Sequence, residues 1–193
     1  MSQARTARMA TRLLWCLGMM AASLLATAHA QEITEVPWVP MREVVFDSTQ
    51  FPSTGTEEDR AILKQIWAKE LAAPRSTGGG QTLPAFALIG DVRQAGRRVV
   101  FTFFAAARND RCEPPENGAD ATNIYSLCSM RVTPWPMQGH KIADLPGYCM
   151  VYAAKRDKNR VEYAFDSSDR VLRLRTIQFG KEVPACSRAL KLG

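Results

Sequence analysis

Histidine is scarce in this sequence, with two residues among 193, and only His140 lies after residue 30. A Ser-His-Asp arrangement therefore has a single candidate base. The chain also lacks G-x-S-x-G, H-E-x-x-H and a glycine-rich phosphate loop with its lysine. His140 is consequently interpreted as an ordinary loop histidine, and no catalytic residue is assigned.

Long apolar runs are missing after residue 30, and the run before it is short. Residues 13–26 form fourteen apolar positions behind Arg5, Arg8 and Arg12, and they precede the small-x-small sequence of residues 28–30. A membrane-spanning helix needs about 20 such residues. Residues 1–30 are therefore predicted to be a cleaved secretory signal peptide, with no membrane span in the mature chain.

Charge of one sign is not in large excess. Past residue 30 the chain carries 22 Lys and Arg against 19 Asp and Glu, which is too mild a balance for a nucleic-acid partner. The basic residues gather in two predicted turns: Arg93, Arg97 and Arg98, then Lys155, Arg156, Lys158 and Arg160. Solvated turns explain them, and an anionic envelope polymer is the alternative partner.

C-x-x-C is absent, which removes support for a zinc ribbon or a redox pair. Four cysteines follow residue 30, namely Cys112, Cys128, Cys149 and Cys186. An even number in an exported chain predicts two disulfides and a periplasmic or secreted location. Three pairings are compatible with the sequence. We favour Cys112–Cys128 and Cys149–Cys186, which would contribute about 3 and about 4 kcal/mol to stability.

Metal ligands have no recognisable spacing. Asp110, Glu113, Glu116, Asn117 and Asp120 offer oxygen donors that calcium accepts, but their order matches no calcium loop. Such residues are also ordinary on a solvent-facing loop. We therefore assign no metal and no cofactor.

One helix is clearly encoded. Thr56 can cap residues 57–73, an apolar stripe runs from Ile62 to Leu71, and Pro74 ends it. Alternating apolar residues predict strands, listed here in chain order: 42–46, 83–92, 98–107, 123–133, 147–154, 160–165 and 170–179. The expected fold is α+β, with one amphipathic helix packed on a predominantly antiparallel, curved sheet of six or seven strands. Residues 31–193 would form a single domain with an extended segment at 31–40.

Two cysteines bracket a long connection between predicted strands. From residue 107 to residue 123 the chain carries two prolines and several polar residues, and structureless connections of this length are often functional. A disulfide across the base would restrict the loop before docking. The predicted binding-loop residues are Glu113, Glu116, Asn117 and Asp120. The alternative is that the staple only stabilises a small exported domain.

Two tryptophans are flanked by proline, Trp38 in VPWVP and Trp135 in TPWPM. Neighbouring prolines restrict both stretches toward extended conformations. If exposed, these side chains can anchor a partner. If buried, they close the ends of the core.

These patterns predict a small exported, disulfide-stabilised binding protein. It would act as an inhibitor or immunity-type protein, presenting loop 112–128 to a protein partner in the cell envelope. One alternative is a structural or accessory subunit of an envelope assembly. Another is a cell-wall polymer hydrolase that uses His140 or a carboxylate pair drawn from Glu162, Asp166 and Asp169.

Overall fold

The structure is a computed structural model, and it describes seven stretches of the chain: residues 36–46, 48–49, 52–76, 79–106, 111–115, 124–151 and 157–193. The predicted signal peptide, residues 1–30, lies outside them. Within these stretches no helix is both long and apolar enough to cross a membrane.

The strands form two sheets, and each pairing within the described residues is antiparallel. The five-stranded sheet contains β1 (Val39–Pro40), β8 (Arg160–Asp166), β9 (Val171–Gln178), β10 (Lys181–Glu182) and β11 (Arg188–Lys191). The six-stranded sheet contains β2 (Arg42–Phe46), β3 (Ala85–Gln94), β4 (Arg97–Ala106), β5 (Cys112–Glu113), β6 (Tyr125–Trp135) and β7 (Ala143–Val151). The antiparallel prediction is confirmed.

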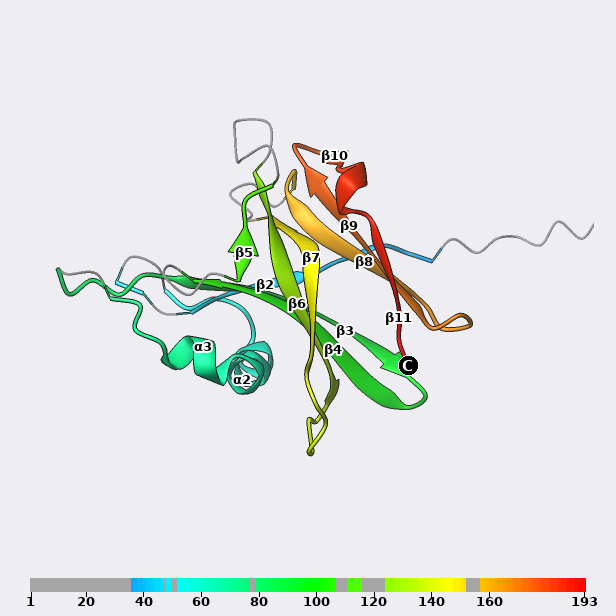
Figure 1. Cartoon of the computed structure of the whole chain (residues 1–193), viewed down its shortest axis with the longest axis horizontal. Coiled ribbons are helices and arrows are strands. Elements are labelled where there is room, and N and C mark those ends of the chain that lie inside the picture. Colours follow the sequence, from blue (N-terminus) through cyan, green and yellow to red (C-terminus); the bar gives the residue numbers. More distant parts are fainter. Residues whose placement is uncertain are drawn as a thin grey trace, which may run out of the picture. The chain divides into compact units, whose positions relative to one another are not determined.

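The middle strand of the six-stranded sheet, β4, is buried on both faces. Val99, Phe101 and Phe103 point into one core, while Val100 and Phe104 point into another. This is the two-residue period of a strand. The first, the inter-sheet core, also contains apolar residues of β8 and β9; the second, the helix-side core, also contains the buried residues of the helices. The six-stranded sheet is therefore the middle of three layers (Figure 1).

The predicted helix is present but divided. Helix α2 spans Glu57–Ile66 and α3 spans Ala68–Ala72, with Trp67 at φ −111° between them. Thr56 caps α2 as predicted, because its hydroxyl accepts the Asp59 N–H at 3.0 Å. Arg131 donates to the carbonyl of Ile66 at 2.8 Å, and a side chain bonded into the helical ladder is a recognised cause of such a break.

Consecutive predicted strands form two hairpins. Strands β3 and β4 pair over their full length around Ala95 and Gly96, and both of these residues have positive φ. Two positive φ values match the turn that joins twisted antiparallel strands. Strands β8 and β9 form a second hairpin. The strand predicted at 42–46 is present as β2, and it pairs with β3.

The predicted single sheet of six or seven strands is wrong in number and arrangement. The structure has eleven strands in two sheets among the described residues. Three of the additional strands, β1, β5 and β10, have two residues each, which is too short for an alternating pattern. The last three predicted strands do not lie in one sheet, because β7 pairs with β6 whereas β8 and β9 belong to the other sheet.

Strand β7 pairs with β6 alone within the described residues. Its register shifts between Leu145 and Tyr148, where Pro146 and Gly147 lie opposite the single residue Ser129. Two residues facing one is a β-bulge. This irregularity lies in the middle of an edge strand.

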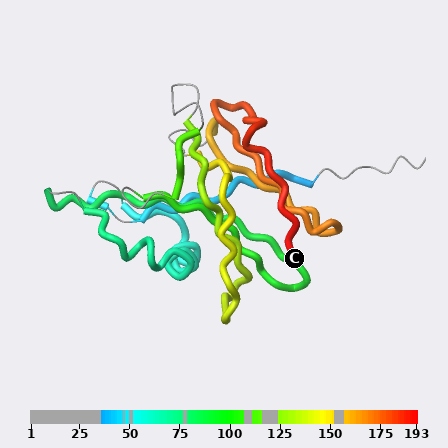
Figure 2. Tube along the Cα trace, in the orientation of Figure 1, coloured from blue at the N-terminus to red at the C-terminus, as the bar shows by residue number. Residues whose placement is uncertain are grey.

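The C-terminus lies beside the β3–β4 turn (Figure 2). The Gln94 side chain donates to the carbonyls of Leu192 and Gly193, each at 3.1 Å. Leu192 is also buried in the inter-sheet core. The last residues are therefore fixed to the six-stranded sheet, although β11 belongs to the five-stranded one.

Candidate binding site

Both predicted disulfides are present with the favoured pairing, Cys112–Cys128 and Cys149–Cys186. Cys112 of β5 lies directly opposite Cys128 of β6, so the first bond joins facing residues of one antiparallel ladder. The described part of the long connection therefore contains a short strand, β5, that pairs with β6. We call Arg111, Cys112, Cys128 and Ile124 the loop root.

Arg111 fixes the first end of the loop root to two other elements. Its guanidinium donates to the buried Glu70 of α3 at 3.0 Å and also to Asp144 of β7. The Arg111 carbonyl accepts the Ser129 N–H at 3.1 Å, which extends the pairing of β5 with β6. The side chain and the backbone of Arg111 therefore both fix the position at which the chain enters the loop.

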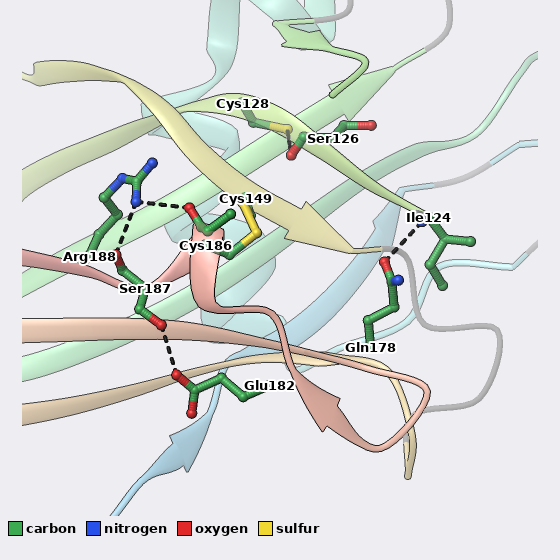
Figure 3. Close-up of a disulfide and its surroundings, with 10 residues drawn as sticks. Ile124, Ser126, Cys128, Cys149, Gln178, Glu182, Cys186, Ser187 and Arg188 are labelled. Carbon is green, nitrogen blue, oxygen red and sulfur yellow. Dashed lines mark hydrogen bonds between the residues drawn. A yellow bond between two sulfur atoms is a disulfide. The ribbon is translucent and has the colours of Figure 1, made fainter. Parts of the chain in front are cut away.

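Ile124 fixes the other end of the loop root. Its N–H donates to the side-chain oxygen of Gln178 at 2.9 Å (Figure 3). Gln178 is the last residue of β9 and is 7% exposed. The exit of the loop is therefore tied to the five-stranded sheet, whereas its entrance is tied to a helix and the six-stranded sheet.

Arg131 also pairs with Glu70, the carboxylate that binds Arg111. Arg131 of β6 binds Glu70 through two nitrogens, at 2.6 and 3.0 Å, and its guanidinium lies 4.0 Å from the centre of the Trp67 ring. Burial alone would raise the pKa of Glu70, but the hydrogen bonds from Arg131 and Arg111 outweigh it and hold that pKa below its usual value. Glu70 is therefore a charged acceptor shared by two arginines.

The second disulfide attaches the edge strand β7 to the segment that follows β10. Cys149 of β7 is bonded to Cys186 in the short helix η1 (Pro184–Cys186) (Figure 3). This bond joins β7 to the chain that follows β10, so it connects the two sheets. The strand that supplies Asp144 to the loop root is itself fixed.

A hollow of about 450 Å³ opens beside the loop root. It is lined by residues of β5, β6 and β7 with their neighbours, namely Arg111, Cys112, Glu113, Leu127, Cys128, Ser129, Pro146 and Gly147. The carboxylate of Glu113 is exposed there and has no ion-pair partner within the described ranges. A partner side chain can therefore meet a free negative charge at this point.

The other predicted loop residues, Glu116, Asn117 and Asp120, lie outside the described residues. Glu113 thus represents the predicted binding-loop set in the structure. The residues that hold the loop root were missed at the sequence level. Glu70 could have been noticed, because an acid on the apolar stripe of a helix needs a partner of opposite charge. Its sequence position does not reveal which arginines bind it.

The two predicted tryptophan anchors are both half-buried. The guanidinium of Arg175 lies 4.2 Å from the centre of the Trp38 ring. Trp135, at the end of β6, packs against the helix-side core. Each ring is therefore already in contact with this protein, and the anchor role of both remains a prediction.

The carboxylates considered for hydrolysis have other partners. Burial alone would raise the pKa of Glu162, but hydrogen bonds from Arg160 at 2.6 Å and Arg175 at 2.7 Å keep it low. Hydrogen bonds from the Ser168 hydroxyl and N–H hold the pKa of Asp166 below its usual value. A general acid needs a raised pKa, so neither group suits that role. His140 is exposed in the β6–β7 loop.

The predicted basic turns are partly neutralised. Arg98 and Arg160, one from each turn, donate to carboxylates, namely those of Glu58, Asp91 and Glu162. Lys155 and Arg156 lie outside the described residues. Among the residues that the structure describes, no group of three His, Cys, Asp or Glu could hold a metal ion, and four of the five calcium candidates lie outside that set.

Comparisons of this chain with protein-family models, curated protein sequences and solved structures found no match. What the site does is therefore inferred from its own residues.

Proposed function

We propose that this chain is an exported binding protein, of the inhibitor or immunity type, that presents loop 112–128 to a protein target in the cell envelope. The observation that carries the proposal is that both ends of the loop root are fixed. Arg111 is held by Glu70 and Asp144, and Ile124 is held by Gln178.

Fixed ends matter because docking a mobile loop costs conformational entropy. A loop whose two ends and one cross-link are already in place loses less freedom when a partner binds. The ion pairs of Arg111 and the Cys112–Cys128 bond both act before the partner arrives. A connection that only had to join β4 to β6 would not need attachments to both sheets.

The charge of the loop indicates the kind of partner. Glu113 presents a carboxylate at the hollow beside the loop root, and Glu116 and Asp120 add two acids to the same loop in the sequence. Complementary charge steers association and penalises wrong partners. We therefore expect a protein partner with a basic contact surface.

The proposed location follows from the cysteines and the N-terminus. Two disulfides persist in oxidising compartments, and residues 1–30 have the pattern of a secretory signal. The periplasm or the extracellular space meets both requirements.

The proposal is tested by capture from envelope extract followed by affinity measurement with the purified partner. The test variants are Cys112→Ser/Cys128→Ser and Glu113→Lys/Glu116→Lys/Asp120→Lys, both confirmed as folded by near-UV circular dichroism. The matched control is Glu57→Lys, an exposed acid in the first turn of α2. We expect the wild type and the control to bind, and both test variants to bind at least about tenfold more weakly.

Unchanged affinity after charge reversal in the loop would contradict the proposal. A partner held equally by the wild type and the disulfide variant would direct attention to Trp38 and Trp135, as an accessory subunit of an assembly requires. The same capture experiment with Trp38→Ala then separates the two functions.

A further inference from the structure

A second hollow, of about 500 Å³, lies at the helix layer and does not involve the loop root. Its described lining consists of Phe46, Ser53, Arg60, Lys64, Leu71 and Arg75. Three of these six side chains are cationic and none is acidic. A concave site with one sign of charge concentrates counter-ions of the other sign.

Arg60 is held in place without losing its charge. Its guanidinium donates to the carbonyl oxygens of Gly55 at 2.6 Å and Thr54 at 3.3 Å. Carbonyl groups are neutral, so they orient the guanidinium, and no carboxylate of the described residues forms an ion pair with it. Arg60 differs in this respect from Arg98 and Arg131, which are bound to carboxylates.

Lys64 adds a second charge one helical turn later. It is exposed, and its ammonium group has no partner within the described residues. Like charges four residues apart on a helix destabilise it, and an anion lying between them removes this repulsion. Arg75 approaches from the chain after α3 and donates to the Leu83 carbonyl at 3.1 Å. Cations from two segments therefore converge on one hollow.

We propose that this hollow binds an oxyanion, a phosphate or carboxylate group carried on a larger molecule such as an anionic envelope polymer. The guanidinium of Arg60 offers the planar set of donors that both groups accept. The volume exceeds that of a bare ion, and Leu71 and Phe46 give the hollow an apolar wall for the adjoining part of the ligand. This site is independent of the loop-mediated function.

The test uses the purified protein and two probes, inorganic phosphate and short poly-glutamate, followed by amide NMR shifts at low salt. We expect saturable shifts at Arg60 and Lys64. Arg60→Gln should weaken binding about tenfold, because it removes a charge-assisted hydrogen bond. Lys64→Gln should weaken it up to about fivefold, the range for an exposed charge pair. Lys69→Gln, an exposed lysine of α3 outside this hollow, should leave binding unchanged.

A second variant keeps the test decisive if Arg60→Gln loosens the turn at Thr54 and Gly55. Lys64→Glu alters an exposed side chain that makes no hydrogen bond or ion pair among the described residues, and it should abolish binding while the protein stays folded. Retained binding in Lys64→Glu, equal weakening by Lys69→Gln, or no saturable shift with either probe would overturn the proposal. Binding of phosphate alone or of poly-glutamate alone would support it and identify the ligand group.

The Cys112→Ser/Cys128→Ser variant separates the two functions. It should bind the anionic probes with unchanged affinity, because the hollow is formed by the helices, β2 and their neighbouring segments. Loss of anion binding in this folded variant would overturn the independence of the two sites.

Discussion

The guanidinium of Arg131 lies 4.0 Å from the centre of the Trp67 ring, and that ring is completely buried. Trp67 also stacks on Phe104 and donates its indole N–H to the Thr102 hydroxyl. A cation among these groups is tolerated because Glu70 supplies the counter-charge. The helix layer, the six-stranded sheet and the loop root therefore meet at one carboxylate.

Replacing Glu70 by Gln should destabilise the fold by about 3 kcal/mol, since it removes the nearer of the two carboxylates that pair with the largely buried Arg131 and leaves only Asp144, at 3.5 Å. Urea unfolding of the two proteins measures the difference. Glu57→Gln, at an exposed position of α2, serves as the control and should change stability by less than about 1 kcal/mol. A loss of that small size for Glu70→Gln would contradict the role assigned to the pair.

Stability should fall in acid. The carboxylates of Asp59, Glu70, Asp91 and Glu162 all have pKa values below their ordinary 3.8 or 4.5, because arginine hydrogen bonds outweigh burial. A lowered folded pKa contributes stability that is fully present above the ordinary pKa and is lost as the pH falls through the folded one.

The melting temperature should therefore hold down to about pH 5 and drop below about pH 4.5. Thermal unfolding at a series of pH values checks this expectation. Glu70→Gln should show a shallower acid drop than the wild type, because it lacks one of the four groups. A wild-type profile that stays flat to about pH 3 would argue against all four ion pairs as sources of stability.

Gly90→Ala should destabilise the protein by about 2 kcal/mol through overpacking. A Cβ at Gly90, in the middle of β3, would collide with the ring of Phe101 and meet the ring of Tyr163 at 3.0 Å. Chemical denaturation of Gly90→Ala, Phe101→Leu and the double variant tests the cause. If the clash is responsible, the double variant loses less stability than the two single variants together; simple additivity would point to another origin.

The two disulfides should differ in their contribution to stability. Their cysteines are 16 and 37 positions apart, and closing the longer loop restricts the unfolded chain more. We expect Cys149→Ser/Cys186→Ser to lose about 4 kcal/mol and Cys112→Ser/Cys128→Ser about 3 kcal/mol. Denaturation under non-reducing conditions gives both values. A clearly larger loss of stability for Cys112→Ser/Cys128→Ser than for Cys149→Ser/Cys186→Ser would contradict this expectation.

Much of the fold could be predicted from local sequence patterns. Alternating apolar residues predicted the strand at 98–107, because side chains of a strand alternate sides. In the structure Val99 and Phe101 are buried on one face of this strand, and Val100 and Phe104 on the other. Thr56 predicted the start of α2, since a hydroxyl there can accept a free N–H. Both inferences needed only neighbouring residues.

Long-range partners account for what the sequence did not reveal. The helix breaks at Trp67, where Arg131 from β6 donates a hydrogen bond to the Ile66 carbonyl. The apolar pattern of the helix alone could not predict this bond. The loop root depends on Glu70 and Gln178, which lie 41 and 54 positions from the residues they hold. The short strand β5 is defined by its pairing with β6 rather than by any alternation of its own.

The bulge in β7 affects how readily this protein would aggregate at high protein concentration. An edge strand exposes backbone groups that can recruit a strand from another molecule, which is a route to aggregation. Pro146 has no N–H to offer, and Gly147 has a positive φ that departs from the extended path. A protein with two sheets and many strand edges thus carries, in the middle of one edge, a built-in obstacle to fibril growth.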